Sequence, residues 1–216
     1  MKIALYYTHD AKPEFLTNVV FARLMEQCTR LNVKLIAVTR RGRSSADVDL
    51  LLEPVGKLDI YERILTGLAE CSLSDYVYLC EDDVLYHDCY FENYHHHDRL
   101  NYNVNLIYHT EFGLSLGNAN RNNCALSQLS AGCECMRTAC NNKLKEIEAG
   151  THVCFEPANG IYNSFAWRST SANIDIRNEH NHTWKATDDM IILDNEPGWG
   201  TFENVTALIQ PQLSGI

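Results

Sequence analysis

The sequence predicts an α/β fold in which a sheet is flanked by helices. Short apolar runs alternate with segments whose apolar residues recur at helical spacing over roughly the first 85 residues. Acidic residues stand directly after the third apolar run. The chain has 216 residues and no internal repeat, so we expect a single domain, residues 1–216, with an ordinary core.

The chain opens with the order strand, helix, strand. Residues 3–7 are predicted to form a buried strand that ends before Thr8. Pro13 favours a helix start, and the apolar residues at helical spacing after it are Phe15, Leu16, Val19, Val20, Leu24 and Cys28. A second strand is predicted at residues 34–38. The basic turn that follows, Arg40-Arg41-Gly42-Arg43, is either solvated or faces a phosphate.

A second helix and a third strand lead to three consecutive acids. Ile60, Ile64, Leu65 and Leu68 have helical spacing, and residues 76–80 read as a strand that stops at Glu81, Asp82 and Asp83. The carboxyl ends of strands are where α/β sheets bind ligands. Glu81 and Asp83 point the same way on an extended chain and can hold a hard cation, which neutralises a diphosphate. The alternative is an acidic loop that simply faces water.

The regularity is weaker after the acids. Strands are predicted at residues 103–108, 125–135 and 171–176, and a polar helix at residues 137–149, starting near Met136. Residues 188–193 fit either a strand or a helix.

Composition excludes several classes of protein. A formal net charge of −10 argues against non-specific binding to duplex DNA. The nine cysteines are odd in number and no export signal accompanies them, so they are interpreted as reduced thiols. No apolar stretch approaches the ~18 residues of a membrane span. We therefore expect a cytoplasmic protein without a membrane span.

Two segments carry a family resemblance: residues 61–68, Tyr-Glu-Arg-Ile-Leu-Thr-Gly-Leu, and residues 76–87, Tyr-Val-Tyr-Leu-Cys-Glu-Asp-Asp-Val-Leu-Tyr-His. Together they resemble a GT-A type glycosyltransferase with a Glu-x-Asp variant of the Asp-x-Asp motif, and are similar to small glycosyltransferase-like proteins of phages and bacteria. Residues 127–129 and 175–177 match more loosely. The resemblance implies a GT-A-like domain with a Rossmann-like mixed sheet, in which residues 1–87 bind the nucleotide sugar and residues 88–216 bind the acceptor.

The resemblance also implies a chemistry. A divalent cation, Mn²⁺ or Mg²⁺, would bridge Asp83 and Glu81 to the diphosphate of a nucleotide-sugar donor, and the sugar would pass to a hydroxyl. The residues expected to bind the donor are Tyr7, Thr8, Arg40, Arg63, Asp82 and Arg177. The relatives carry a His soon after the Asp-Ile-Arg segment, whereas here Asn178 follows Arg177 and the imidazoles come later. His180 or His182 is therefore either a late metal ligand or part of a solvated loop.

The other roles are less defined. Besides Asp83, the candidate catalytic residues are Asp188 and Asp189, either of which is placed to act as general base, with Glu134 as another acid. The acceptor is a glycan, a small molecule or a hydroxymethylated base in phage DNA, and the acidic charge favours the first two. A nucleotidyltransferase and a non-catalytic binding module are the alternative functions.

Three further motifs have alternative readings. His95-His96-His97 is a solvated loop or an acceptor-binding lid. Gly198-Trp199-Gly200 is a turn that anchors a tryptophan, or one whose indole stacks on a sugar or base. Cys133 and Cys135 are expected at alternate strand positions as small hydrophobic residues rather than as zinc ligands.

Overall fold

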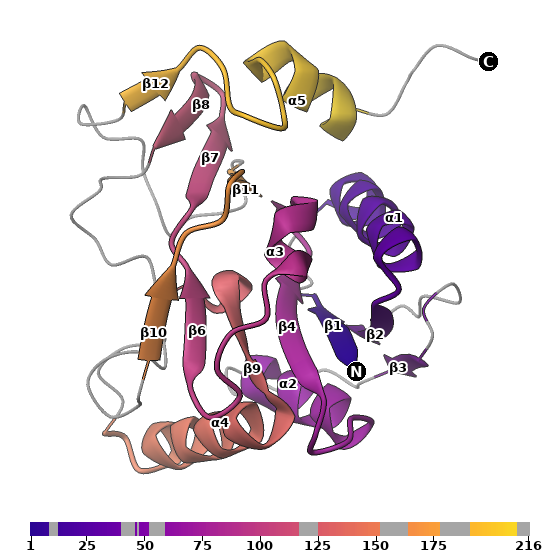
Figure 1. Cartoon of the computed structure of the whole chain (residues 1–216), viewed down its shortest axis with the longest axis vertical. Coiled ribbons are helices and arrows are strands. Elements are labelled where there is room, and N and C mark those ends of the chain that lie inside the picture. Colours follow the sequence, from indigo (N-terminus) through magenta and orange to yellow (C-terminus); the bar gives the residue numbers. More distant parts are fainter. Residues whose placement is uncertain are drawn as a thin grey trace.

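The computed structural model describes residues 1–8, 13–39, 46, 48–51, 59–116, 125–151, 164–177 and 191–210 (Figure 1). Its helices are α1 (Glu14–Leu31), α2 (Asp59–Ala69), α3 (Asp88–Glu92), α4 (Cys133–Glu148) and α5 (Phe202–Ile209), with a short 3-10 helix, η1 (Leu126–Gln128). Its strands are β1 (Lys2–Tyr7), β2 (Lys34–Thr39), β3 (Val48–Leu51), β4 (Tyr76–Glu81), β5 (Val84–Leu85), β6 (Leu100–Asn103), β7 (Leu106–Thr110), β8 (Gly113–Leu116), β9 (Leu129–Gly132), β10 (Ser164–Trp167), β11 (Asn173–Ile176) and β12 (Ile191–Leu193).

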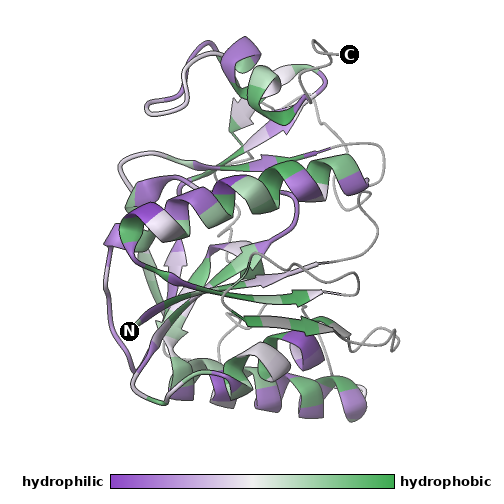
Figure 2. Cartoon of the chain, turned by 90° about the vertical axis from the view of Figure 1, so that its right-hand side faces the viewer, coloured by the Kyte–Doolittle hydropathy of each residue, from purple (hydrophilic) through white to green (hydrophobic). Residues whose placement is uncertain are grey.

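The larger sheet has the order β10-β6-β9-β4-β1-β2-β3 in the described part of the chain. All neighbouring strands are parallel except at β9, which runs antiparallel to both β4 and β6. Helix α1 covers one face, and α2 and α4 cover the other, as Figure 2 shows. This is the layered α/β arrangement that buries a sheet on both sides.

The two faces of β1 show why its sequence is a continuous apolar run. Ala4 and Tyr6 pack with the residues of α1, whereas Ile3, Leu5 and Tyr7 pack with α2 and α4. Because successive side chains of a strand point to opposite faces, a strand covered on both sides has no polar face.

A second sheet has the order β12-β8-β7-β11-β5 among the described residues. Strand β5 pairs antiparallel with β11, and β11 pairs parallel with β7. The turn of Asp82 and Asp83 connects β4 of the first sheet to β5 of the second. The acids therefore lie where the two sheets meet.

The predicted fold class, a single α/β domain with a mixed sheet flanked by helices, is confirmed. The three strands predicted before the acids are β1, β2 and β4, and these and helices α1 and α2 lie within a few residues of their predicted positions, whereas β3 was not predicted. Both sheets cross the boundary at residue 87, because β4 pairs with β9 and β5 pairs with β11. The division of function between residues 1–87 and 88–216 stays a prediction. No helix in the described ranges is long and apolar enough to cross a membrane.

Several predicted elements are wrong in type or extent. Residues 103–108 span parts of two strands, β6 and β7. The strand predicted at residues 125–135 is η1 followed by the short β9, and α4 begins at Cys133 with Gly132 as its N-cap. Cys133 and Cys135 therefore lie in the first turn of a helix and not on alternate strand positions. Within residues 188–193, the described part is strand β12.

Candidate active site

Glu81 ends β4, the central strand that pairs with β1 and β9, and two tyrosines hold it. The Tyr7 hydroxyl donates a hydrogen bond to Glu81 Oε1 at 2.6 Å. The backbone N–H of Glu81 donates to the Tyr86 hydroxyl at 2.9 Å. Both tyrosines are buried, whereas Glu81 is half-buried. The Glu81 carboxylate is thus held in place at the carboxyl edge of the sheet while remaining accessible.

Asp82 and Asp83 form the turn that follows, and both are buried, with exposed fractions of 0% and 4%. The alternative of an acidic loop that simply faces water is therefore wrong for these two residues. Burial of a carboxylate is costly unless it is compensated, so these acids need nearby donors or positive charge.

Strand β11 brings positive charge to the acids. The Ile176 N–H donates to the Asp83 carbonyl oxygen at 2.8 Å, which fixes β11 beside the turn. Directly after this strand, the Arg177 guanidinium donates through Nη2 to Asp175 Oδ2. It also lies over the Tyr108 ring, with its central carbon 4.9 Å from the ring centroid.

The charge balance at this edge explains why Arg177 stays ionised. Burial by itself lowers the pKa of Arg177, but Asp175, and after it Tyr108, Asp83 and Glu81, raise it, and the pKa lies above its ordinary value. Glu81, Asp83 and Asp175 therefore all act on Arg177 where the two sheets meet. We call these four residues the acid–arginine cluster.

Asp175 is not among the predicted site residues. No local signal marked it, because an acid that alternates with Ile174 and Ile176 in a strand usually points to the solvent face, whereas here its exposed fraction is 6%. A charged residue in a buried strand needs a partner, and the neighbouring Arg177 is the obvious one.

The end of β1 is held from α2. Arg63, with 1% of its surface exposed, donates to the Thr8 carbonyl oxygen and, at 3.1 Å, to Thr8 Oγ1. Arg63 thus braces the strand end that lies beside Glu81. Direct contact of Thr8, Arg63 or the buried Asp82 with a donor stays a prediction.

Five predicted site residues lie outside the described residues: Arg40, His180, His182, Asp188 and Asp189. Within the described ranges, no group of three His, Cys, Asp or Glu side chains is close enough to hold a metal ion. Mg²⁺ is usually held by one or two protein carboxylates, with waters and substrate phosphates completing its shell. The hard oxygen donors of Glu81 and Asp83 fit such a cation.

Glu134 as an alternative general base is wrong. It lies in the first turn of α4, directly after β9. Gly132 at the end of β9 pairs with Tyr76, the first residue of β4, whereas Glu81 is the last. Glu134 and the acids therefore lie at opposite ends of the sheet.

Hydrogen bonds of buried amide side chains link the segments that carry the cluster. The Asn173 side chain at the start of β11 donates to Gln128 Oε1 at 2.8 Å and accepts from the His87 N–H at 3.0 Å. The Tyr86 hydroxyl, which accepts from Glu81, donates to the Ser127 carbonyl oxygen at 3.2 Å. These contacts join β11, η1 and the segment after the acids, and the sequence analysis predicts none of them.

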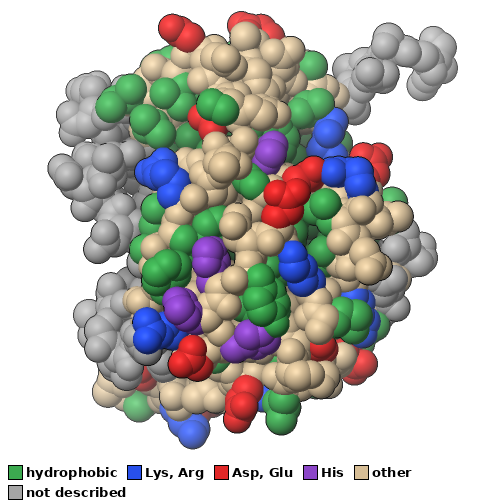
Figure 3. Space-filling view, viewed as in Figure 1, with side chains coloured by type: hydrophobic (Ala, Val, Ile, Leu, Met, Phe, Trp, Pro, Cys, Tyr) green, Lys and Arg blue, Asp and Glu red, His purple; other side chains and the backbone are tan. Residues whose placement is uncertain are grey.

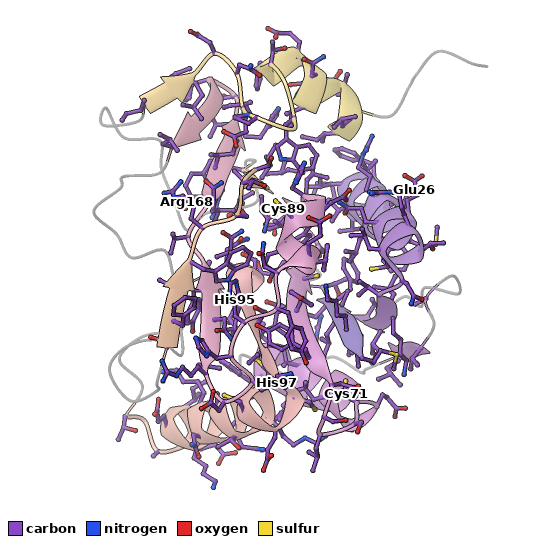
Figure 4. The ribbon with its side chains drawn as sticks, in the orientation of Figure 1. Glu26, Cys71, Cys89, His95, His97 and Arg168 are labelled. Carbon is purple, nitrogen blue, oxygen red and sulfur yellow. The ribbon has the colours of Figure 1, made fainter. Side chains whose placement is uncertain are left out.

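The three consecutive histidines pack against aromatic rings. His95 lies 4.5 Å from the Trp167 ring and His96 lies 5.1 Å from the Phe165 ring, centroid to centroid. Figure 3 shows histidines gathered among hydrophobic side chains on this face, and Figure 4 labels His95 and His97. The segment has no helix or strand, as predicted, and its role as an acceptor-binding lid stays a prediction.

Comparison with known proteins finds a likeness among solved structures. No family model matches the sequence, and no curated protein matches it. Among solved structures, the chain is similar to a variant of the Drosophila β-1,4-galactosyltransferase 7 in complex with manganese, UDP-Gal and xylobiose. The two chains are 12% identical, 88% of this chain and 78% of the other are covered, and the TM-score is 0.43. At this identity and TM-score the likeness decides nothing about activity.

Proposed function

We propose that the protein is a metal-dependent glycosyltransferase that moves a sugar from a nucleotide-sugar donor to a hydroxyl acceptor. The observation that carries this proposal is the acid–arginine cluster. It combines carboxylates at the end of a central strand with a guanidinium held beside them, at the edge where α/β sheets bind ligands.

The residues of the cluster divide the work of binding a diphosphate. Glu81 and Asp83 would hold Mn²⁺ or Mg²⁺, which supplies positive charge to the departing nucleoside diphosphate. Arg177 pairs with two phosphate oxygens at once, as a planar guanidinium can. Asp175 keeps Arg177 oriented before the donor arrives, and Tyr7 keeps the Glu81 carboxylate at the sheet edge.

The transfer itself exchanges one bond for another. The bond between the sugar's anomeric carbon and the diphosphate oxygen breaks, and the acceptor oxygen bonds to that carbon as its hydroxyl proton leaves. We assign the proton to Asp188 or Asp189. One of His180 and His182, but not both, would complete the cation's ligands, because residues two apart in sequence seldom both reach one ion. Arg40, Thr8 and Arg63 would contact the donor.

The acceptor is proposed to be a hydroxyl of a glycan or a small molecule, in keeping with the net charge of −10. A hydroxymethylated base in phage DNA, flipped out of its stack, is the second acceptor class, and it would place the protein in the cytoplasm of an infected cell. Incubation with labelled donor sugars and either oligosaccharides or hydroxymethyl-containing DNA separates the two classes.

Thermal unfolding with nucleotides tests the proposal. Saturation with a nucleoside diphosphate at about 100 times its Kd stabilises a protein by about 2.7 kcal/mol. For a chain of this length, that raises Tm by about 5–10 °C. We expect this shift with UDP or GDP only when Mn²⁺ is present. UDP and manganese are the first ligands to try, since the Drosophila enzyme was crystallised with manganese and UDP-Gal.

Matched variants sharpen the test. Asp83→Asn should lose the shift, whereas Asp98→Asn, an exposed acid elsewhere, should keep it. A larger shift with triphosphates than with diphosphates would favour a nucleotidyltransferase. No shift with any nucleotide, with or without metal, would leave a non-catalytic module.

A further inference from the structure

A small cavity lies between α1 and Trp199, and none of the acid–arginine cluster lines it. Its volume is about 150 Å³. A cavity of about this volume accommodates a six-membered ring such as benzene. Its polar lining comes from Arg23, Glu26, Gln27 and Arg30 of α1, with Tyr86 and Trp199 opposite.

The Trp199 wall of the cavity is held by several contacts. The indole N–H donates to the Ala172 carbonyl oxygen at 2.7 Å, and the Ala172 N–H donates to Glu196 Oε1 at 3.0 Å. Gly198 has a φ of +89°, and a Cβ there would lie 2.6 Å from His87 Nε2. The turn that carries Trp199 is thus tightly packed, and the predicted anchoring of the tryptophan is confirmed.

The α1 wall supplies polar groups at fixed positions. The Gln27 amide nitrogen donates to the Tyr86 carbonyl oxygen at 2.6 Å and to Asp88 Oδ1 at 3.0 Å, which sets the plane of its side chain. Arg23 is half-buried and Glu26 is exposed, so both charged groups stand at the rim; Figure 4 labels Glu26 on α1. Leu24 and Val20 form an apolar floor.

This combination matches the surface of a sugar ring. One face of a pyranose presents C–H groups that pack on an aromatic ring, while its edge presents hydroxyls that both donate and accept hydrogen bonds. Trp199 offers the aromatic surface, and Arg23, Glu26 and Gln27 offer donors and acceptors in planar groups. Arg30 at the rim is paired with Asp88, and Glu26 balances the charge of Arg23, which disfavours an anionic ligand.

We propose that this cavity is a carbohydrate-binding pocket for a neutral hexopyranose unit, separate from the acid–arginine cluster. The proposal does not depend on glycosyl transfer. A single sugar has about 12 non-hydrogen atoms, which at the efficiency usual for larger ligands gives a Kd on the order of 1 mM.

Saturation-transfer-difference NMR with the full chain tests the pocket. The probes are the methyl β-glycosides of glucose and galactose and methyl α-mannoside, with benzyl alcohol as an aromatic comparison. We expect saturation to be transferred from the protein to the ring C–H protons of at least one glycoside. Arg23→Ala should weaken that binding at least about tenfold, because a charged hydrogen bond is lost. Lys145→Ala, which removes an exposed cation from α4, should not change it.

Two further variants decide where the sugar binds. Trp199→Leu should abolish saturation transfer to the glycoside. If that variant does not fold, Arg23→Ala still tests the pocket. Asp83→Asn should bind the glycoside as the wild type does, even if no nucleotide binds either protein. The proposal is overturned if no glycoside receives saturation, if only benzyl alcohol does, if Arg23→Ala binds as tightly as Lys145→Ala, or if the signal disappears in Asp83→Asn.

Discussion

The ion pair of Asp175 and Arg177 makes a quantitative prediction. Its side chains are 8% and 20% exposed, so solvent screens the pair only in part. Asp175→Asn leaves the guanidinium without its nearest carboxylate, and Arg177→Met leaves the carboxylate without its cation. Either change should lower the free energy of unfolding, and the double variant should lose less than the sum of the two.

The magnitude follows from the surroundings. Breaking a fully buried ion pair costs about 3–5 kcal/mol, and a hydrogen bond to a charged group contributes about 1.5–3 kcal/mol. Arg177 is partly exposed and keeps Tyr108, Asp83 and Glu81 as neighbours after Asp175 is changed. We therefore expect each single change to cost about 2–3 kcal/mol. The interaction free energy of the pair should be about 1–2 kcal/mol.

Urea unfolding followed by circular dichroism measures all four proteins of this cycle. The pair of Arg30 and Asp88, whose side chains are 57% and 27% exposed, is the control. Exposed ion pairs contribute about 0.2–1 kcal/mol, so Arg30→Met should cost little. Additive effects of Asp175→Asn and Arg177→Met, within about 0.5 kcal/mol, would refute the arrangement inferred for the cluster.

Three other perturbations have defined outcomes. Asp83→Asn should abolish sugar transfer and Glu81→Gln should reduce it less, as measured with labelled donor at limiting Mn²⁺; equal activities of wild type and Asp83→Asn would contradict the metal assignment. Gly198→Ala should lower stability by about 2–4 kcal/mol in urea unfolding, because a left-handed φ and an overlap with a neighbouring ring are both forced on the alanine. Burial lowers the pKa of His109, so the unfolded chain binds more protons just below pH ~6.5 and stability should fall as the pH drops through that value. His109→Gln should flatten this dependence in urea titrations at several pH values, and an unchanged slope would show that His109 does not cause it.

The central strands and the acids were predictable because their signals are local. Residues 76–80 form an apolar run that fits a strand buried on both faces, and Glu81 ends it by breaking that run. Asp83 and Glu81 follow from the same run, since position after a strand is enough to place a side chain at the sheet edge.

The partners of the acids were not predictable in the same way. Asp175 and Arg177 reach the acids through the pairing of β11 with β5, and no local pattern shows that a two-residue strand will pair with a segment so distant in sequence. The start of α4 was misread for another reason. Residues 129–132 are apolar and small, and the helix begins at Cys133 without a side-chain cap to mark it.

The turn of Asp82 and Asp83 belongs to neither sheet, and this has a consequence for folding. Strand β4, before the turn, pairs with β1 and β9, and strand β5, after the turn, pairs with β11. Contacts between segments far apart in sequence form late, because closing long loops costs entropy before any contact compensates for it. A nascent chain that ends before residue 173 therefore carries three adjacent carboxylates and no Arg177. Under the proposed function, nucleotide binding requires the pairing of β11 with β5 and would therefore report on that pairing.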